Sequence, residues 1–459
     1  MTKRALTAFI LVLSAASHLH AVSYWTETAS QIDEIVANAK TVPPPGMLQP
    51  LLANVPFSNF RYPHVDAHEN VTFIADDPVY SDKVAHHGIY RSMGGTGELR
   101  PLVRKDETAV PNTSMRFDWF RGLQVDGADF VFNATDSGGD RGLYHWSDNK
   151  IQLIARTGFT SLPEVGRALT EVEYGALADG RVLYNAKAGK ENLLVLHDLK
   201  TQRARVLCRS GMPVPGRKDE QLRYFSPQDW LDHSNIVFRA ATVDDPHAKG
   251  KSALGQRGIY GWLGIDWKKP DESLNPGRLV TLADRFSRVP LQPEKSQFND
   301  FRSAPVRAGL VAFVGSDRGF YNGNREAGFD GVYYYDLNAA DKFVRPVVDT
   351  ESRLEGLFSG SFTRFGIFGS VFEKSVVFVG YAKGGYVGVF LFRTDRDELF
   401  LLCDNRNLIE NKQVQDFEIA GDFLVRNRFA VTAHFRDETS GVYLATIPMR
   451  CFKRMADAK

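Results

Sequence analysis

A tyrosine and an arginine near the middle of the chain have the side-chain types best suited to chemistry on an acidic substrate. Tyr224 and Arg239 are separated by about the length of one β-hairpin, and antiparallel pairing would bring two such residues to the same region. A phenol can carry a proton, and a guanidinium fork binds a carboxylate through paired hydrogen bonds. A core aromatic residue beside a surface arginine is the alternative, and the sequence supports both interpretations equally.

Histidines form a second candidate group in the first third of the chain. His64 follows a Phe-x-x-Phe start, and Gln124 takes the equivalent place in the next copy of that pattern. His86 and His87 precede a Gly-aromatic step, and His145 follows the next one. A structural histidine is the simpler explanation for each of these alone. Four of them in two adjacent repeats favour a shared function, because imidazole exchanges protons near neutral pH.

A repeat that recurs seven times must position these candidates. The full pattern has a Phe-x-x-Phe-like start, an apolar run ending in a small residue, a Gly-aromatic step and a last apolar run, although the third copy has Leu193–Leu196 in place of the Gly-aromatic step. The runs are rich in β-branched and aromatic residues and are bounded by turn formers, which predicts strands. Copies lie about 50 to 75 residues apart, which is typical of propeller blades. The first runs are Val71–Ala75, Phe130–Ala134, Val182–Ala186, Ile236–Ala240, Val311–Gly315, Val376–Gly380 and Phe429–Ala433.

The last apolar run indicates how the ends of the chain meet. Six copies have this run, but none follows Gly441, and Leu48–Ala53 stands before the first copy with the same pattern. We therefore expect an all-β fold, a seven-bladed β-propeller of four-stranded blades, closed by Leu48–Ala53 as an N-terminal strand in the last blade. An open array of β-sandwiches, the rival fold, would have no use for a displaced strand.

The order of segments predicts four regions. Residues 1–21 read as a signal peptide, with Lys3 and Arg4 before an apolar run and small residues near Ala21. Residues 22–46 are expected to form a linker and a helix around Ser30–Lys40. The propeller is expected to span 47–450, followed by a C-terminal tail at 451–459. The mature protein is therefore expected to be secreted, either periplasmic or extracellular.

Composition excludes several classes of protein. The net charge of +1 gives no electrostatic support for nucleic-acid binding. No stretch after the signal approaches the roughly 18 apolar residues that would predict a membrane span. Three cysteines are too few for a disulfide scaffold and lack zinc-site spacing. Asp244 and Asp245 could hold a structural calcium ion, although two adjacent aspartates are usually a solvated turn.

With histidines in its early blades and a tyrosine and an arginine one hairpin apart, the chain resembles secreted seven-bladed propeller polysaccharide lyases, the ulvan lyases among them. His145, Tyr224 and Arg239 are the strongest matches, while Gln124 stands where a second histidine is expected. The resemblance implies that Arg239 neutralises a uronate carboxylate, that Tyr224 or His145 removes the C5 proton, and that a tyrosine or histidine protonates the leaving oxygen. The implied substrate-binding residues are His64, His87, Gln124, Tyr260 and Arg302.

Three functions remain open from the sequence. The leading hypothesis is a lyase that cleaves a uronate-containing anionic polysaccharide by β-elimination and requires no cofactor. The second is a non-catalytic propeller that binds a glycan or a protein at the cell surface. The third is a propeller glycoside hydrolase with Glu171 and Glu173 as its carboxylates, which the distance between the two carboxyl groups would test.

The signal sequence predicts a processed N-terminus close to Val22. Mass spectrometry of the exported protein should find this terminus, because a basic start and an apolar run followed by small residues direct cleavage there. An intact Met1 on protein retained in the cytoplasm would contradict export.

Overall fold

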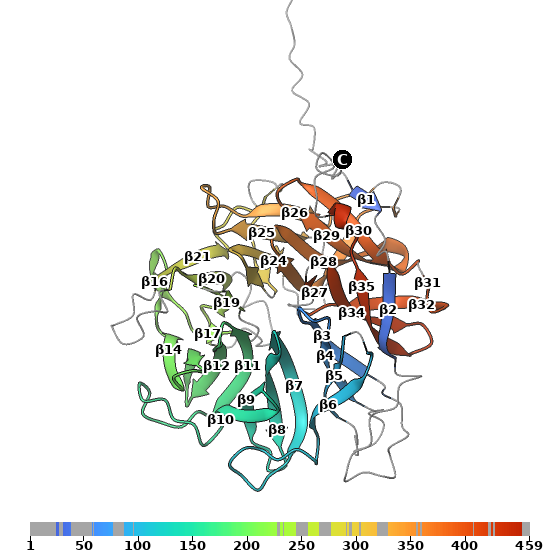
Figure 1. Cartoon of the computed structure of the whole chain (residues 1–459). Helices are drawn as coiled ribbons and strands as arrows, with labels where there is room; N and C mark the ends of the chain where they lie inside the picture. The colour runs from blue at the N-terminus through green and yellow to red at the C-terminus, as the bar shows by residue number, and fades with distance from the viewer. Residues whose placement is uncertain are drawn as a thin grey trace, which may run out of the picture.

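Seven antiparallel sheets follow one another around a ring in the computed structural model (Figure 1). They confirm the predicted all-β seven-bladed propeller, and we number the blades one to seven in chain order. The structure describes residues 24–26, 31–37, 57, 59–76, 87–94, 96–226, 230–232, 234–244, 256–265, 277–290, 292, 296–302, 304–318, 329–354, 357–358, 360–406, 408–420, 424–425 and 427–451.

The four strand positions of the blades match the four elements of the repeat. The innermost strands are β3 (Asn59–Val65), β7 (Phe117–Asp126), β11 (Glu171–Ala178), β17 (Tyr224–Phe225) with β18 (Trp230–Asp232), β22 (Asp300–Phe301) with β23 (Val306–Arg307), β27 (Phe362–Phe372), and β32 (Lys412–Glu418) with β33 (Leu424–Val425). The second strands are β4 (Val71–Asp76), β8 (Asp129–Asp136), β12 (Arg181–Ala188), β19 (Asn235–Ala241), β24 (Leu310–Ser316), β28 (Ser375–Ala382) and β34 (Arg428–Phe435).

The outer half of each blade continues the same order. The third strands are β5 (Gly88–Ser92), β9 (Arg141–Ser147), β13 (Glu191–Asp198), β20 (Arg257–Leu263), β25 (Asp330–Asp336), β29 (Tyr386–Arg393) and β35 (Ser440–Thr446). The fourth strands of blades one to six are β6 (Leu99–Arg104), β10 (Lys150–Arg156), β14 (Arg203–Arg209), β21 (Arg278–Asp284), β26 (Arg345–Asp349) and β30 (Glu398–Asp404). A hairpin of β15 (Pro213–Val214) and β16 (Arg217–Gln221) precedes blade four, and β31 (Leu408–Ile409) pairs with β32.

Close packing of an aromatic ring against a glycine explains the Gly-aromatic step. In blade two the Tyr144 ring folds back over Gly142, where an added Cβ would lie 2.5 Å from the Tyr144 hydroxyl oxygen. Tyr333 covers Gly331 in the same way in blade five. The Phe117 ring meets the Tyr144 ring edge-on at 4.9 Å, so the first aromatic residue of the repeat packs on the third strand. The repeat thus encodes a buried aromatic cluster in blades such as the second and the fifth, whereas the core of blade three is aliphatic around Tyr184.

Two N-terminal strands differ from the sequence prediction. β2 (Gln31–Ala37) pairs antiparallel with β35, with Ala37 opposite Gly441, and β1 (Tyr24–Thr26) pairs parallel with β30. The helix expected around residues 30–40 is therefore wrong. Leu48–Ala53 lies outside the described residues. β2 occupies the edge of β35 at which the sequence predicts Leu48–Ala53. A short apolar run is compatible with the period of a helix and with that of a strand. Here the unpaired edge of β35 makes the segment a strand.

Within the part of the chain that the structure describes, no helix is long and apolar enough to cross a membrane. The signal peptide and its cleavage site lie outside the described residues. Cys208, Cys403 and Cys451 are all buried, as apolar packing residues would be.

Deleting residues 1–37 should lower the unfolding temperature more than deleting residues 1–23. The longer deletion removes both N-terminal strands and exposes the backbone hydrogen-bonding edge of β35, whereas the shorter one retains both strands. Differential scanning calorimetry of the two truncated proteins provides the comparison. Equal unfolding temperatures would show that these strands add nothing to stability.

Candidate functional site

Charged side chains meet between blades two, three and four. They come from residues on either side of the buried residue of an innermost strand. Val172 is buried in blade three, and alternation along β11 places its neighbours Glu171 and Glu173 on the opposite face. Tyr224 stands at the corresponding place before buried Phe225 in blade four. The side chains on this face belong to the junctions between blades.

Glu171 and Glu173 share a hydrogen bond, and Lys187 forms an ion pair with Glu171. Burial, followed by the hydrogen bond and charge of Glu171, raises the pKa of Glu173 to about 7. Burial also acts to raise the pKa of Glu171, but hydrogen bonds with Lys187 and Glu173 outweigh it and hold that pKa below its usual value. The pair therefore holds a single proton near neutral pH, which is the property of a general acid or base.

Glu173 lies between two small cavities that differ in character. One is also lined by Tyr224, Lys187, Asn185 and Asn192. Burial and then the nearby charge of Glu173 raise the pKa of Tyr224 above its usual value, so the phenol stays protonated.

The second cavity presents cations to the same carboxyl group. Arg121 and Arg141, both exposed, line it together with Glu173, Asn133 and Thr135. The charge of Arg141 acts on Glu173 to lower its pKa. With one proton on the glutamate pair, Arg121, Arg141 and Lys187 outnumber the remaining negative charge. This junction therefore favours an anionic ligand.

Arg239 connects blade four to blade five. It is 8% exposed, and its Nη1 donates a hydrogen bond of 2.6 Å to the carbonyl oxygen of Phe301. Tyr224 pairs with Ala241 on the same strand as Arg239, and the Arg239 charge acts to lower the pKa of Tyr224. Arg239 thus lies near Tyr224 while its guanidinium is engaged with backbone.

His64 and Arg302 form the same kind of contact between blades. His64 Nε2 lies 3.0 Å from the carbonyl oxygen of Leu123 in blade two. Arg302 Nη1 donates to the carbonyl oxygen of Phe365 in blade six over 2.8 Å. These two residues of the predicted substrate-binding set therefore fasten one blade to the innermost strand of the next.

His145 lies away from Tyr224 and Arg239. His145 lies on β9 and pairs with Val131 on β8. Its Nε2 is 3.4 Å from a carboxylate oxygen of Asp129, at the start of β8. This is the end of blade two at which β7 turns into β8, whereas Tyr224 and Arg239 lie at the end where the innermost strand begins. The structure does not bring the three predicted catalytic residues together.

The other predicted residues are largely packing groups. His87 is fully buried with its ring 4.2 Å from that of Trp119, and burial followed by the Arg61 charge lowers its pKa to about 3, which keeps it neutral. Tyr260 is 1% exposed and stacks on Phe238 at 5.9 Å, and burial raises its pKa to about 12. Gln124 is half-buried on β7 opposite Val131.

The glutamate pair is the candidate for the glycoside hydrolase alternative. Retaining enzymes hold their two carboxyl groups about 5 Å apart and inverting enzymes hold them farther apart. Glu171 and Glu173 act on each other's pKa from neighbouring positions on β11, and the hydrolase function stays a prediction. Among the described residues no group of three or more histidine, cysteine or acidic side chains is arranged to hold a metal ion. Asp244 is described and Asp245 is not, so the calcium site there stays a prediction.

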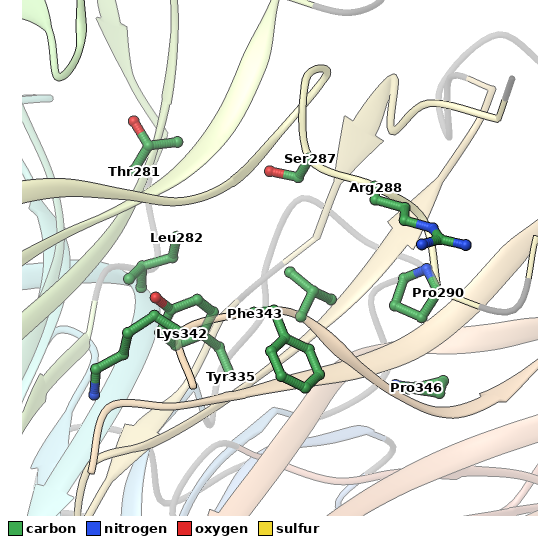
Figure 2. A pocket seen from close by; sticks show the side chains of 10 residues that line it. Thr281, Leu282, Ser287, Arg288, Pro290, Tyr335, Lys342, Phe343 and Pro346 are labelled. Atoms are coloured by element: carbon green, nitrogen blue, oxygen red, sulfur yellow. The ribbon is translucent and has the colours of Figure 1, made fainter. Parts of the chain in front are cut away.

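A larger cavity of about 570 Å³ lies on the outer rim, between β21 and the outer strands of blade five (Figure 2). Tyr335 and Phe343, together with prolines and aliphatic residues, give it an apolar wall. Of the described residues that line it, Arg288 and Lys342 carry charge, and Figure 2 shows them at opposite sides of the cavity. This cavity offers no acid and base in contact, which leaves the junction around Glu173 as the candidate site.

Comparison with known proteins identifies no family for this chain. No protein-family model matches the chain, and neither does any curated protein. Similar solved structures include the β-propeller domain of the Trilobed protease from Pyrococcus furiosus, with 10% identity, coverage of 85% of this chain and 93% of that chain, and a TM-score of 0.48. The polysaccharide lyase Uly1 has 9% identity, coverage of 84% and 90%, and a TM-score of 0.47. A prolyl endopeptidase has 12% identity, coverage of 84% and 47%, and a TM-score of 0.49. All three structures are less than 25% identical to this chain and have TM-scores below 0.5, so they identify neither a family nor an activity.

Replacing Glu173 with glutamine should flatten the pH dependence of stability. The pKa of Glu173 rises from 4.5 to about 7 on folding, so the folded protein binds this proton more tightly than the unfolded chain does. Its contribution to stability is full at acidic pH, falls as pH rises through that interval, and is lost above it. The substituted amide would stay neutral and still donate a hydrogen bond to Glu171.

Unfolding temperatures at about pH 5 and about pH 8 test this sign. The wild-type protein should lose more stability over that interval than Glu173→Gln, and the exposed substitution Glu438→Gln serves as the control. An identical loss in wild type and Glu173→Gln would show that the Glu173 proton is not retained on folding.

Proposed function

We propose that this protein is a secreted polysaccharide lyase that cleaves a uronate-containing anionic polysaccharide by β-elimination. The observation that carries the proposal is the pKa of Glu173, which is about 7, in a junction that also presents the exposed guanidinium groups of Arg121 and Arg141. A base for the C5 proton and a cation for the neighbouring carboxylate are the two groups that this elimination needs. Binding alone would not need a glutamate pair that shares a proton.

The residues supply each step of the elimination. Arg121 and Arg141 pair with the uronate carboxylate and stabilise the negative charge that develops when C5 loses its proton. The carboxylate form of Glu173 takes that proton. As the electron pair forms the C4–C5 double bond, the bond from C4 to the glycosidic oxygen breaks. The protonated phenol of Tyr224 donates to the leaving oxygen and recovers a proton from Glu173.

This scheme changes two roles that the family resemblance implies. Proton abstraction, which the resemblance gives to Tyr224 or His145, passes to Glu173, because Glu173 lines the same cavity as Tyr224 and His145 does not. Arg239 becomes a positioning residue that fastens the strand beside Tyr224 to blade five through Phe301, and Arg121 and Arg141 take over the carboxylate. The scheme requires no cofactor, and a calcium ion near Asp244 would be structural.

A non-catalytic propeller that binds an anionic glycan is the second candidate. The exposed arginines at the junction would support binding whether or not the glutamate pair transfers a proton. A turnover assay separates the two functions, because a binding module releases no unsaturated product.

Incubation with a panel of uronate polysaccharides should generate the ultraviolet absorbance of the unsaturated product. Glu173→Gln and Tyr224→Phe should each reduce kcat by about 100-fold or more while leaving binding largely intact, since they remove groups that move protons. Arg121→Gln should raise KM as well as lower kcat. His145→Gln serves as the matched control and should retain turnover.

Two results would reject this assignment. Loss of turnover in His145→Gln with full turnover in Glu173→Gln would show that His145, and not Glu173, is the base. Absence of product from every polysaccharide, together with measurable binding, would favour the non-catalytic propeller.

A further inference from the structure

A second polar cavity, of about 560 Å³, lies between blades six and seven. Its described lining includes Arg364 at the start of β27, Tyr381 at the end of β28, Asp416 on β32, and Arg436 just after β34. Arg364 and Arg436 are both exposed, so their guanidinium groups are accessible to a ligand. The volume is within the range of small-molecule sites.

The aromatic ring of Tyr381 orients the charged groups of this cavity. The Arg364 guanidinium carbon lies 3.8 Å from the centroid of the Tyr381 ring, and the Tyr381 hydroxyl donates to an Asp416 carboxylate oxygen over 2.8 Å. The same Asp416 oxygen accepts the backbone N–H of Phe417 over 2.7 Å. Stacking leaves the edge of a guanidinium, where its N–H donors lie, available for an oxyanion.

The mixture of charges indicates a sugar acid rather than a simple anion. Two guanidinium groups attract a carboxylate or sulfate, but the Asp416 carboxylate beside them repels a small anion that fills the whole site. Sugar hydroxyls donate hydrogen bonds, so they satisfy Asp416 while the acidic group of the same ring meets the arginines. Gln415, which is exposed and lines the cavity, adds an amide that can accept or donate.

We propose that this cavity binds an acidic residue of a saccharide, with Arg364 and Arg436 on its carboxylate or sulfate and Asp416 on its hydroxyls. The class of ligand rests on the proposed function. Arg364 and Asp416 precede the buried residues Phe365 and Phe417, which is the repeat position that Glu171 and Tyr224 hold in blades three and four. The cavity is therefore a second subsite at the same end of the ring, three blades away from Glu173.

NMR titration with D-glucuronate and with glucose 6-sulfate tests the subsite, with D-glucose and inorganic phosphate as comparison probes. The Arg121→Gln/Arg141→Gln protein should retain binding of one or both acidic sugars, because the second cavity is intact. Adding Arg364→Gln and Arg436→Gln should weaken that binding about tenfold or more, as expected for the loss of a charge-assisted hydrogen bond. Arg203→Gln, an exposed arginine on β14, is the matched control.

The outcomes separate the subsite from the lyase proposal. Loss of acidic-sugar binding in the Arg364 and Arg436 variants supports the subsite even if the wild-type protein shows no turnover, in which case only the lyase proposal fails. Unchanged binding in folded variants, or equal binding of phosphate, overturns the subsite even if turnover is present. The two acidic probes show whether a carboxylate or a sulfate is the preferred group.

Discussion

The geometry of the innermost strands is the constraint on which both candidate sites depend. One residue of each such strand must point into the aromatic core of its blade, as Val172, Phe225, Phe365 and Phe417 do. Because side chains alternate along a strand, the residues before and after this buried residue point towards the neighbouring blade. A polar residue at these flanking positions therefore meets the polar residues of the next blade in a partly dry junction, where charges interact strongly.

The junctions differ because their side chains satisfy this constraint in different ways. At blades four and five, Arg239 donates to a backbone carbonyl oxygen, and at blades five and six Arg302 does the same. These contacts stabilise the ring and leave little for a ligand. At blades three and four, Asn185 and Asn192 also donate to backbone carbonyl oxygens, those of Ser226 and Arg223. This junction differs because blade three adds two interacting carboxyl groups, Glu171 and Glu173, beside Tyr224. Chemistry becomes possible where a junction holds ionisable groups in addition to its hydrogen bonds to the backbone.

The repeat made the fold predictable, because its periodic aromatic and glycine positions have the same structural explanation wherever they recur. Gly142 and Gly331 are required by the rings that cover them, a contact that needs no knowledge of distant residues. The N-terminal strand was less predictable. Gln31–Ala37 and Leu48–Ala53 both carry short apolar runs, and which run meets the edge of β35 depends on the path of the chain outside the repeat.

The candidate site was only partly predictable for a related reason. Hairpin pairing correctly places Arg239 on the strand beside Tyr224, but sequence does not show that Arg239 reaches Phe301. Glu171 and Glu173 alternate along one strand, which identifies a shared face. Their shared proton depends on burial and on Lys187, neither of which a linear pattern displays.

The distribution of charge around the ring also bears on the shape of a ligand. Glu171, beside Glu173, and Arg364 occupy the same repeat position, so the junction and the second cavity both lie at the end of the ring where the innermost strands begin. A monosaccharide can meet only one of them at a time. An extended chain with a regular spacing of acidic groups can meet both, and the second contact is then made at high effective concentration. If both proposals hold, the two sites together would favour a polymer over its isolated units without any additional contact at Glu173.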